Sequence, residues 1–117
     1  MRELPIVPLP CDSASLLVRG QIVQWSSGGQ MVQPWSSASV VPLGVCTADA
    51  DLSLAQVDVY CGKGASVLLK CAPGVVPAIN DLLYYGTTGA VSNTLNGPPF
   101  ARAIGIGFNG YVEAIIT

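Results

Sequence analysis

The sequence predicts an all-β domain, a small single-domain sandwich or barrel of short, mostly antiparallel strands. Thirteen glycines and nine prolines interrupt the 117 residues every few positions, and the runs between them are rich in Val, Ile, Leu and Tyr, which favour strands. No segment keeps a helical period over three turns, and the best helical candidate, residues 48–56, is long enough for a single turn only. This length suits one domain with a core of its own.

Residues 1–15 are expected to form an extended N-terminal arm that precedes a β domain of residues 16–117. Prolines 5, 8 and 10 fix φ and lack an N–H, so neither a helix nor a central strand suits this segment. They also interrupt the apolar run that a signal peptide requires. Apolar side chains alternate with the prolines and are predicted to contact another surface. These candidate partner-binding residues are Leu4, Ile6, Val7 and Leu9.

The strands of the domain follow from alternation and turn residues. Val57 and Val59 fall on one face of residues 56–60, and the Gly-rich residues 61–64 turn the chain into the next strand. Residues 26–39 are rich in Ser, Gly and Gln and predict a loop or an irregular hairpin. Gly20 interrupts the first strand, and Pro42 places the second at an edge or a bulge. The predicted strands are residues 16–25, 40–47, 56–60, 65–70 and 82–85, followed by a C-terminal hairpin.

The C-terminal hairpin has the clearest turn signal. Asn109-Gly110 favours a two-residue type I′ turn. With this tip, Phe108 pairs with Tyr111, and Ile104 pairs with Ile115.

The strand that leads into this turn presents only small side chains on one face. Ala101, Ala103, Gly105 and Gly107 share that face, which allows another sheet or chain to approach closely. Gly105 and Gly107 are therefore candidate interface positions.

The same glycines complete a G-x-G-x-x-G spacing, GIGFNG, which is the spacing of a dinucleotide-binding loop. That loop requires a following helix and an acidic residue about 20 positions later, whereas the β-branched YVEAIIT after Gly110 predicts a strand. Gly62-Lys63-Gly64 lacks the Ser or Thr and the upstream glycine of a phosphate loop. Asp49-x-Asp51 lacks the other ligands of a calcium loop. We expect no cofactor and no metal.

Charge and composition exclude several classes of partner. The net charge is −2, and the five basic residues are scattered, whereas nucleic-acid binding needs a concentrated basic surface. No apolar run approaches the ~20 residues of a membrane span. Charged residues make up 10% of the chain, against about 25% in typical soluble domains. A surface with so few charges favours oligomerisation or docking.

No residue set supports catalysis. The chain has no histidine, so a Ser or Cys nucleophile would lack its usual base. Asp58 and Glu113 are isolated carboxylates on predicted strands. The four cysteines contain no C-x-x-C pair. We expect a protein made in a reducing cytoplasm, with free and mostly buried thiols, and a Cys61–Cys71 bridge is the alternative. We expect a protein that is not an enzyme and has no catalytic residues.

Six short segments follow one another in a recognisable order: GQIV (20–23), VPLGV (41–45), VDVYCG (57–62), AINDLLY (78–84), TGAV (88–91) and IGIG (104–107). Their order resembles that in the head-decoration, or capsid cement, proteins of tailed bacteriophages. Asn80 stands where this family usually has glycine, and Gln21 replaces its usual acidic residue. Residues 26–39 have no clear counterpart.

The resemblance implies a structural virion protein. Such a protein forms a homotrimer on the outer surface of an assembled phage capsid, binds the major capsid protein and stabilises the shell by clamping neighbouring subunits. Trp25 and Trp35 are candidate interface residues, since tryptophans often anchor interfaces. The alternative is a carbohydrate- or receptor-binding β module of a phage tail or surface appendage, with Trp25, Trp35, Tyr84 and Tyr85 as its platform.

Overall fold

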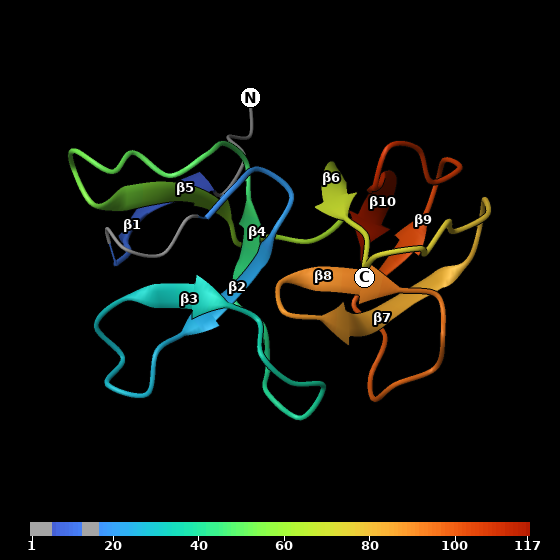
Figure 1. The fold of residues 1–117 in the computed structure, drawn as a ribbon, viewed down its shortest axis with the longest axis horizontal. Coiled ribbons are helices and arrows are strands. Elements are labelled where there is room, and N and C mark those ends of the chain that lie inside the picture. The colour runs from blue at the N-terminus through green and yellow to red at the C-terminus, as the bar shows by residue number, and fades with distance from the viewer. Residues whose placement is uncertain (1–5, 13–16) are drawn as a thin grey trace.

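The computed structural model describes residues 6–12 and 17–117, and within these ranges the chain forms ten β-strands and no helix (Figure 1). The strands make two five-stranded sheets, and every pair of neighbouring strands is antiparallel. The all-β prediction is confirmed. The strands are β1 (Ile6–Pro10), β2 (Ile22–Trp25), β3 (Val32–Pro34), β4 (Gly44–Cys46), β5 (Gln56–Tyr60), β6 (Ser66–Lys70), β7 (Leu82–Thr87), β8 (Ala90–Ser92), β9 (Ala101–Ala103) and β10 (Tyr111–Ile116).

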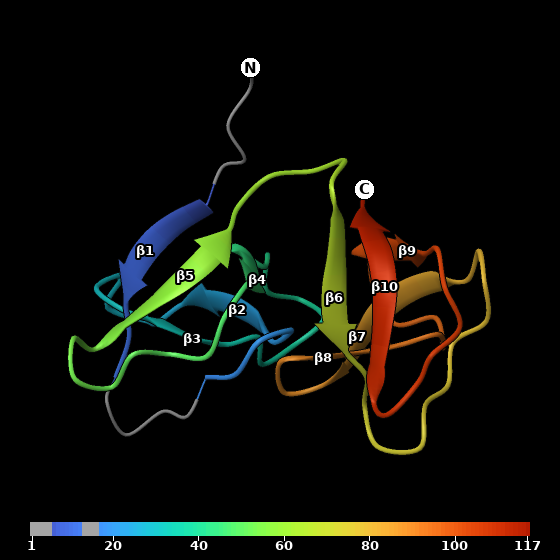
Figure 2. The same ribbon diagram turned by 90° about the horizontal axis from the view of Figure 1, so that it is seen from above.

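The two sheets have the same topology. The first has the order β1-β5-β4-β2-β3 and the second has the order β6-β10-β9-β7-β8, which is the first order repeated five strands later. In Figure 2, β1 and β6 run in one direction, and β5 and β10 run in the opposite direction. The chain is therefore two copies of one five-stranded unit, residues 6–60 and 66–116, in similar orientations.

The turns before β2 and β7 show this repeat at the level of single hydrogen bonds. The Gly20 N–H donates to the Cys46 carbonyl (2.9 Å), and the Asn80 N–H donates to the Ala103 carbonyl (2.8 Å). Both turn residues have a left-handed backbone, with φ of 92° at Gly20 and 77° at Asn80. Asn tolerates this conformation better than most residues other than Gly, so both residue types suit the position.

Two cysteines occupy equivalent positions in the units. Cys11 follows β1 and forms a parallel bridge to Val32, and Cys71 follows β6 and forms a parallel bridge to Val91. Both are buried, and Cys46 is buried as well, whereas Cys61 is exposed. All four are free thiols, as predicted.

The core lies between the two sheets, and the first sheet also packs on its outer face. Ile22, Val45 and Tyr60 of the first sheet meet Leu69, Leu83 and Val91 of the second. A second cluster covers the other face of the first sheet. The valines predicted to share a face of β5 belong to this cluster, whose buried members are Cys11, Leu17, Val23, Val32, Cys46, Val57 and Val59.

The described part of the expected N-terminal arm is an edge strand. β1 pairs with β5 along its whole length, from Ile6 opposite Tyr60 to Pro10 opposite Gln56. The prolines of β1 are compatible with an edge position, because an edge strand uses its backbone N–H groups for pairing on one side only. The segment predicted to be a free extended arm is therefore, over Ile6–Pro10, a strand of the first sheet. Leu4 lies outside the described residues.

The C-terminal hairpin has the predicted tip and a different register. Phe108 and Tyr111 exchange backbone hydrogen bonds of 2.8 and 3.0 Å, as predicted. Ile115, however, pairs with Arg102 and not with Ile104, a shift of two positions. The shift arises because the backbone leaves the ladder near Gly107, whose N–H donates to the Pro77 carbonyl (2.8 Å).

Gly107 is in close contact with another part of the same chain. A Cβ at Gly107 would lie 2.6 Å from Pro77 Cδ, whereas the nearest atom to a Cβ at Gly105 would be Glu113 Cβ at 3.8 Å. The small residues of this strand were expected to let another sheet or chain approach closely. At Gly107 the segment that approaches is residues 76–77 of the same chain.

Several strand boundaries differ from the prediction. The expected strands 16–25 and 40–47 shrink to β2 and β4, with Pro42 outside the latter, and β8 lies in no predicted strand. The segment 26–39 contains β3, so it is the irregular hairpin and not a plain loop. No helical turn forms in residues 48–56.

Candidate functional site

Trp35 joins the two units. Its side chain is 2% exposed, and its Nε1 donates to the Val40 carbonyl (2.8 Å). Its ring lies 5.1 Å from the Tyr85 ring in an edge-to-face arrangement and 5.7 Å from the Phe100 ring. Aromatic pairs of this geometry stabilise beyond their buried area. Trp35 therefore stabilises the contact between the units within one chain.

The platform considered for carbohydrate binding is not formed. Trp35 and Tyr84 are buried, while Trp25 is 42% exposed at the end of β2. The Tyr85 hydroxyl is committed to the Ser36 carbonyl (2.9 Å). These four rings share no exposed surface on which a sugar could stack.

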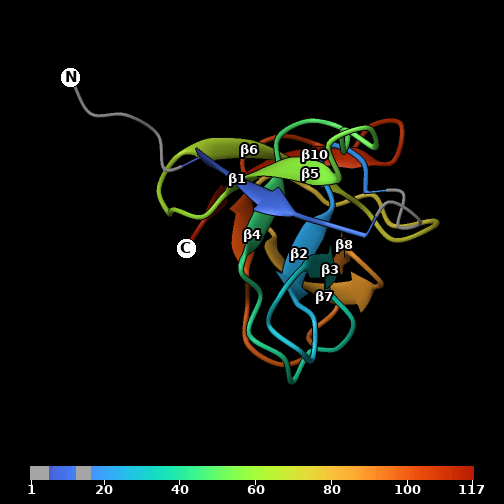
Figure 3. The same ribbon diagram turned by 90° about the vertical axis from the view of Figure 1, so that its left-hand side faces the viewer.

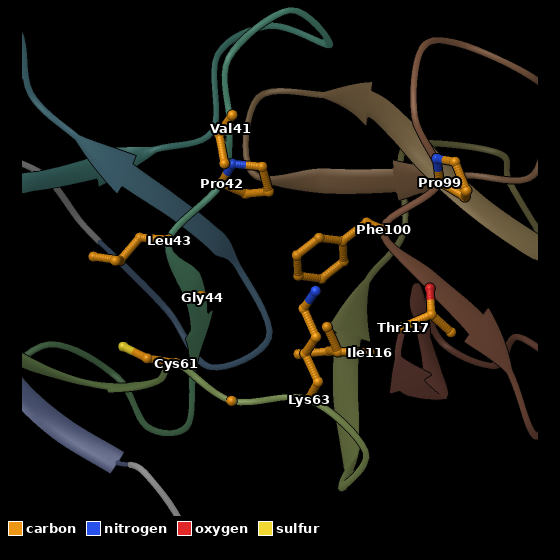
Figure 4. Close-up of a pocket in the computed structure, with 11 residues that line it drawn as sticks. Val41, Pro42, Leu43, Gly44, Cys61, Lys63, Pro99, Phe100, Ile116 and Thr117 are labelled. Carbon is orange, nitrogen blue, oxygen red and sulfur yellow. The ribbon is translucent and has the colours of Figure 1, made fainter.

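An apolar groove lies where the two units meet (Figure 4). It has a volume of about 210 Å³ and continues into a second hollow of about 170 Å³. In Figure 4 the Lys63 side chain extends toward the Phe100 ring, and it is the one charged side chain among the lining residues. An acid–base pair is absent from this lining. Both hollows are lined by Val41, Pro42, Pro99 and Phe100.

The largest set of exposed apolar side chains lies on loops. Three loops, residues 47–55, 71–81 and 104–110, lie at the end of the molecule where β5 and β10 begin and β1 and β6 end (Figure 2). We call this end the loop face. Sequence reasoning missed it, since loop residues carry no periodic signal. Its most exposed apolar side chains are Leu54, Val76, Ile79, Ile106 and Phe108.

Aspartates hold two loops of the molecule in shape. The pKa of Asp51 is lowered by hydrogen bonds from the Ser53 hydroxyl and the Leu54 N–H. The pKa of Asp81 is lowered by hydrogen bonds from the Ala78 N–H and the Asn93 amide. These carboxylates therefore act as acceptors in turns.

The geometry around Asp49 does not resemble a calcium loop. Asp49 Oδ1 accepts the Arg19 N–H (2.9 Å). Across residues 6–12 and 17–117, no three His, Cys, Asp or Glu side chains are grouped so that they could hold a metal ion. The described residues also include no helix of the length and apolar character needed to cross a membrane.

The predicted arm residues have different surroundings. Ile6 and Val7 are exposed on β1, and Leu9 packs against the second core cluster. Ile6 and Val7 are thus available to a partner, while Leu9 stabilises the domain.

The fold and these surfaces define a duplicated two-sheet β domain whose exposed apolar groups suit binding. No family model matches the chain, and no curated protein sequence matches it. Among solved structures, the chain is similar to the head fiber gp8.5 N base of bacteriophage phi29. The TM-score is 0.71 at 20% sequence identity, over 96% of this chain and 94% of the other. At this identity the likeness shows the fold.

Proposed function

We propose that this chain is a structural protein of a phage head, which binds the outer surface of the assembled capsid. The observation that carries the proposal is the fold shared with the phi29 head fiber base over nearly the whole of both chains. The segment order seen in head-decoration proteins supports the same role. In this role the chain binds the major capsid protein and clamps neighbouring capsid subunits.

Exposed apolar groups and the absence of a catalytic constellation among the described residues support a role in binding. Ile6 and Val7 on the edge strand β1 are each 42% exposed. Their burial against the shell or a neighbouring copy would contribute about 25 cal/mol per Å² of apolar surface. They are the described residues through which the N-terminal segment is expected to act.

The internal repeat supports a homotrimer. Within one chain, the Ile22 N–H donates to the Gly89 carbonyl (3.0 Å), and the Gly89 N–H donates to the Trp35 carbonyl (2.8 Å). The two units thus use different surfaces, one from each, to contact one another. Such a head-to-tail contact leaves one copy of each surface free at the two ends of the chain. Repeated between chains, a contact of this kind generates a ring when the rotation between successive units closes.

Side chains at these two free surfaces are exposed. Trp25 in β2 corresponds to Tyr85 in β7, and Leu95 corresponds to Ser36, the partner of Tyr85 within the chain. Trp25 and Leu95 are 42% and 76% exposed. In the proposed trimer, Trp25 of one copy contacts the Leu95 region of the next, and three copies close a ring of six units.

The function is tested by adding the purified chain to phage heads that lack it. We expect co-sedimentation with intact heads and a higher temperature of head disruption. Isolated capsid subunits at the same concentration are the control. Chains that stay in the supernatant with intact heads would contradict the proposal.

The trimer is tested on heads and in solution with Trp25→Ala. Val41→Ala is the control, since Val41 is 86% exposed and lines the groove between the two units of one chain. Light scattering and native mass spectrometry should show that Trp25→Ala shifts trimers to monomers and that Val41→Ala does not. A wild-type monomer both in solution and on decorated heads would contradict the trimer.

A further inference from the structure

We propose that the loop face is the surface that meets the phage head, through apolar anchors bordered by carboxylates. Its counterpart on the shell would offer apolar pockets next to Lys or Arg side chains. This inference rests on the proposed attachment to heads and adds which surface makes it. Two observations carry it: the breadth and rigidity of this face, and the charges around its anchors.

The loop face lies across the two long axes of the molecule. The molecule measures 36 × 35 × 24 Å, and Figure 2, which turns the shortest axis upright, shows the three loops gathered at one broad side. Their exposed apolar side chains therefore point to the same side of the molecule as its widest dimensions.

Both units contribute an exposed anchor from equivalent loops. Leu54 lies in the loop that precedes β5, and Phe108 lies in the loop that precedes β10. They are 65% and 77% exposed. Isolated exposed apolar residues are common, but several on one face mark an interaction site. In a trimer, three copies of each anchor would face the same way.

Hydrogen bonds hold the backbone at both anchors, Leu54 and Phe108. Phe108 exchanges two backbone hydrogen bonds with Tyr111. The N–H groups of Ser53 and Leu54 both donate to Asp51 Oδ1, at 3.0 and 3.3 Å. Little conformational freedom of the loop backbone is lost when such anchors are buried, which favours affinity.

The charges beside the anchors indicate the chemistry of the partner. Asp49 and Asp51 are exposed in the loop 47–55, and the hydrogen bonds that lower the pKa of Asp51 keep it charged. The Arg19 side chain lines a hollow beside β6 that also contains Glu113. Lys70 is partly buried at the end of β6. Cationic groups on the other side favour an interface that buries these two carboxylates near apolar anchors.

The test compares two variants for binding to heads. The first, Leu54→Ser with Phe108→Ser, removes one anchor from each unit. The second, Val41→Ser, removes a side chain that is 86% exposed, borders the groove and lies outside the loop face. We expect the double variant to lose about ten-fold or more in affinity, Val41→Ser to stay within about two-fold, and wild-type affinity to fall as salt rises.

Equal binding by the double variant and the wild type, or loss of binding only in Val41→Ser, would overturn the inference while leaving head attachment intact. Failure of the wild type itself to bind would instead overturn the proposed function. Circular dichroism establishes that both variants fold. Electron cryomicroscopy of decorated heads gives an independent readout: loops 47–55 and 104–110 should face the shell, and the opposite orientation would overturn the inference.

Discussion

A substitution at Gly107 tests whether the small residues of this strand pack against the same chain. In Gly107→Ala the new Cβ would lie 2.6 Å from Pro77 Cδ, 3.1 Å from Pro77 N and 3.2 Å from Val76 Cα. The backbone atoms among these neighbours cannot rotate away as the end of a side chain can. The hydrogen bond from the Gly107 N–H to the Pro77 carbonyl is 2.8 Å and holds the two segments together. The extra methyl group must therefore push them apart.

Overpacking of this kind costs about 1–3 kcal/mol. Unfolding entropy is roughly 2.1 cal/mol/K per residue, so each kcal/mol lowers the Tm of a chain of this length by about 4 °C. Gly107→Ala should therefore unfold about 4–12 °C below the wild type in thermal denaturation followed by circular dichroism.

Gly105→Ala is the matched control two positions away. Its Cβ would have one neighbour, Glu113 Cβ, at an ordinary 3.8 Å, and Ala restricts the unfolded chain more than Gly does. Its Tm should equal or slightly exceed that of the wild type. A stable Gly107→Ala together with a destabilised Gly105→Ala would refute the packing described for this strand.

Three further predictions concern stability and chemistry. Burial raises the pKa of the Cys46 thiol to about 12, so in the native protein at pH 8 a thiol reagent should label the exposed Cys61 first. After denaturation the reagent should label all four thiols. Immediate labelling of four thiols in the native protein would contradict the burial. The Ala78 N–H is the main cause of the lowered pKa of Asp81, so the stability that this carboxylate contributes is present above its ordinary pKa of 3.8 and is lost as pH falls through the lower folded value. Asp81→Asn should thus have a lower Tm at pH 7 and converge with the wild type in acid, and a Tm difference that is independent of pH would exclude this role. Leu83→Ala removes a fully buried core side chain and should cost about 2–5 kcal/mol in chemical denaturation, whereas a cost below 1 kcal/mol would contradict its place between the sheets.

The sequence by itself determined the fold class and several local features, because these depend on short-range backbone chemistry. Gly and Pro spacing predicted short strands, and Asn109-Gly110 predicted the hairpin tip that the structure contains. The alternation of Val57 and Val59 predicted a shared buried face. The prolines of the N-terminal segment excluded a central strand, and β1 is an edge strand.

Only the tertiary structure decided the internal repeat, the register of the last hairpin and the surfaces available to a partner. Equivalent positions such as Gly20 and Asn80 share backbone geometry and not side-chain identity, so the repeat leaves little trace in the sequence. The register shifted because a distant loop at Pro77 binds Gly107. Burial of Trp35 and exposure of Phe108 likewise depend on segments far away in the chain, which no local pattern of residues encodes.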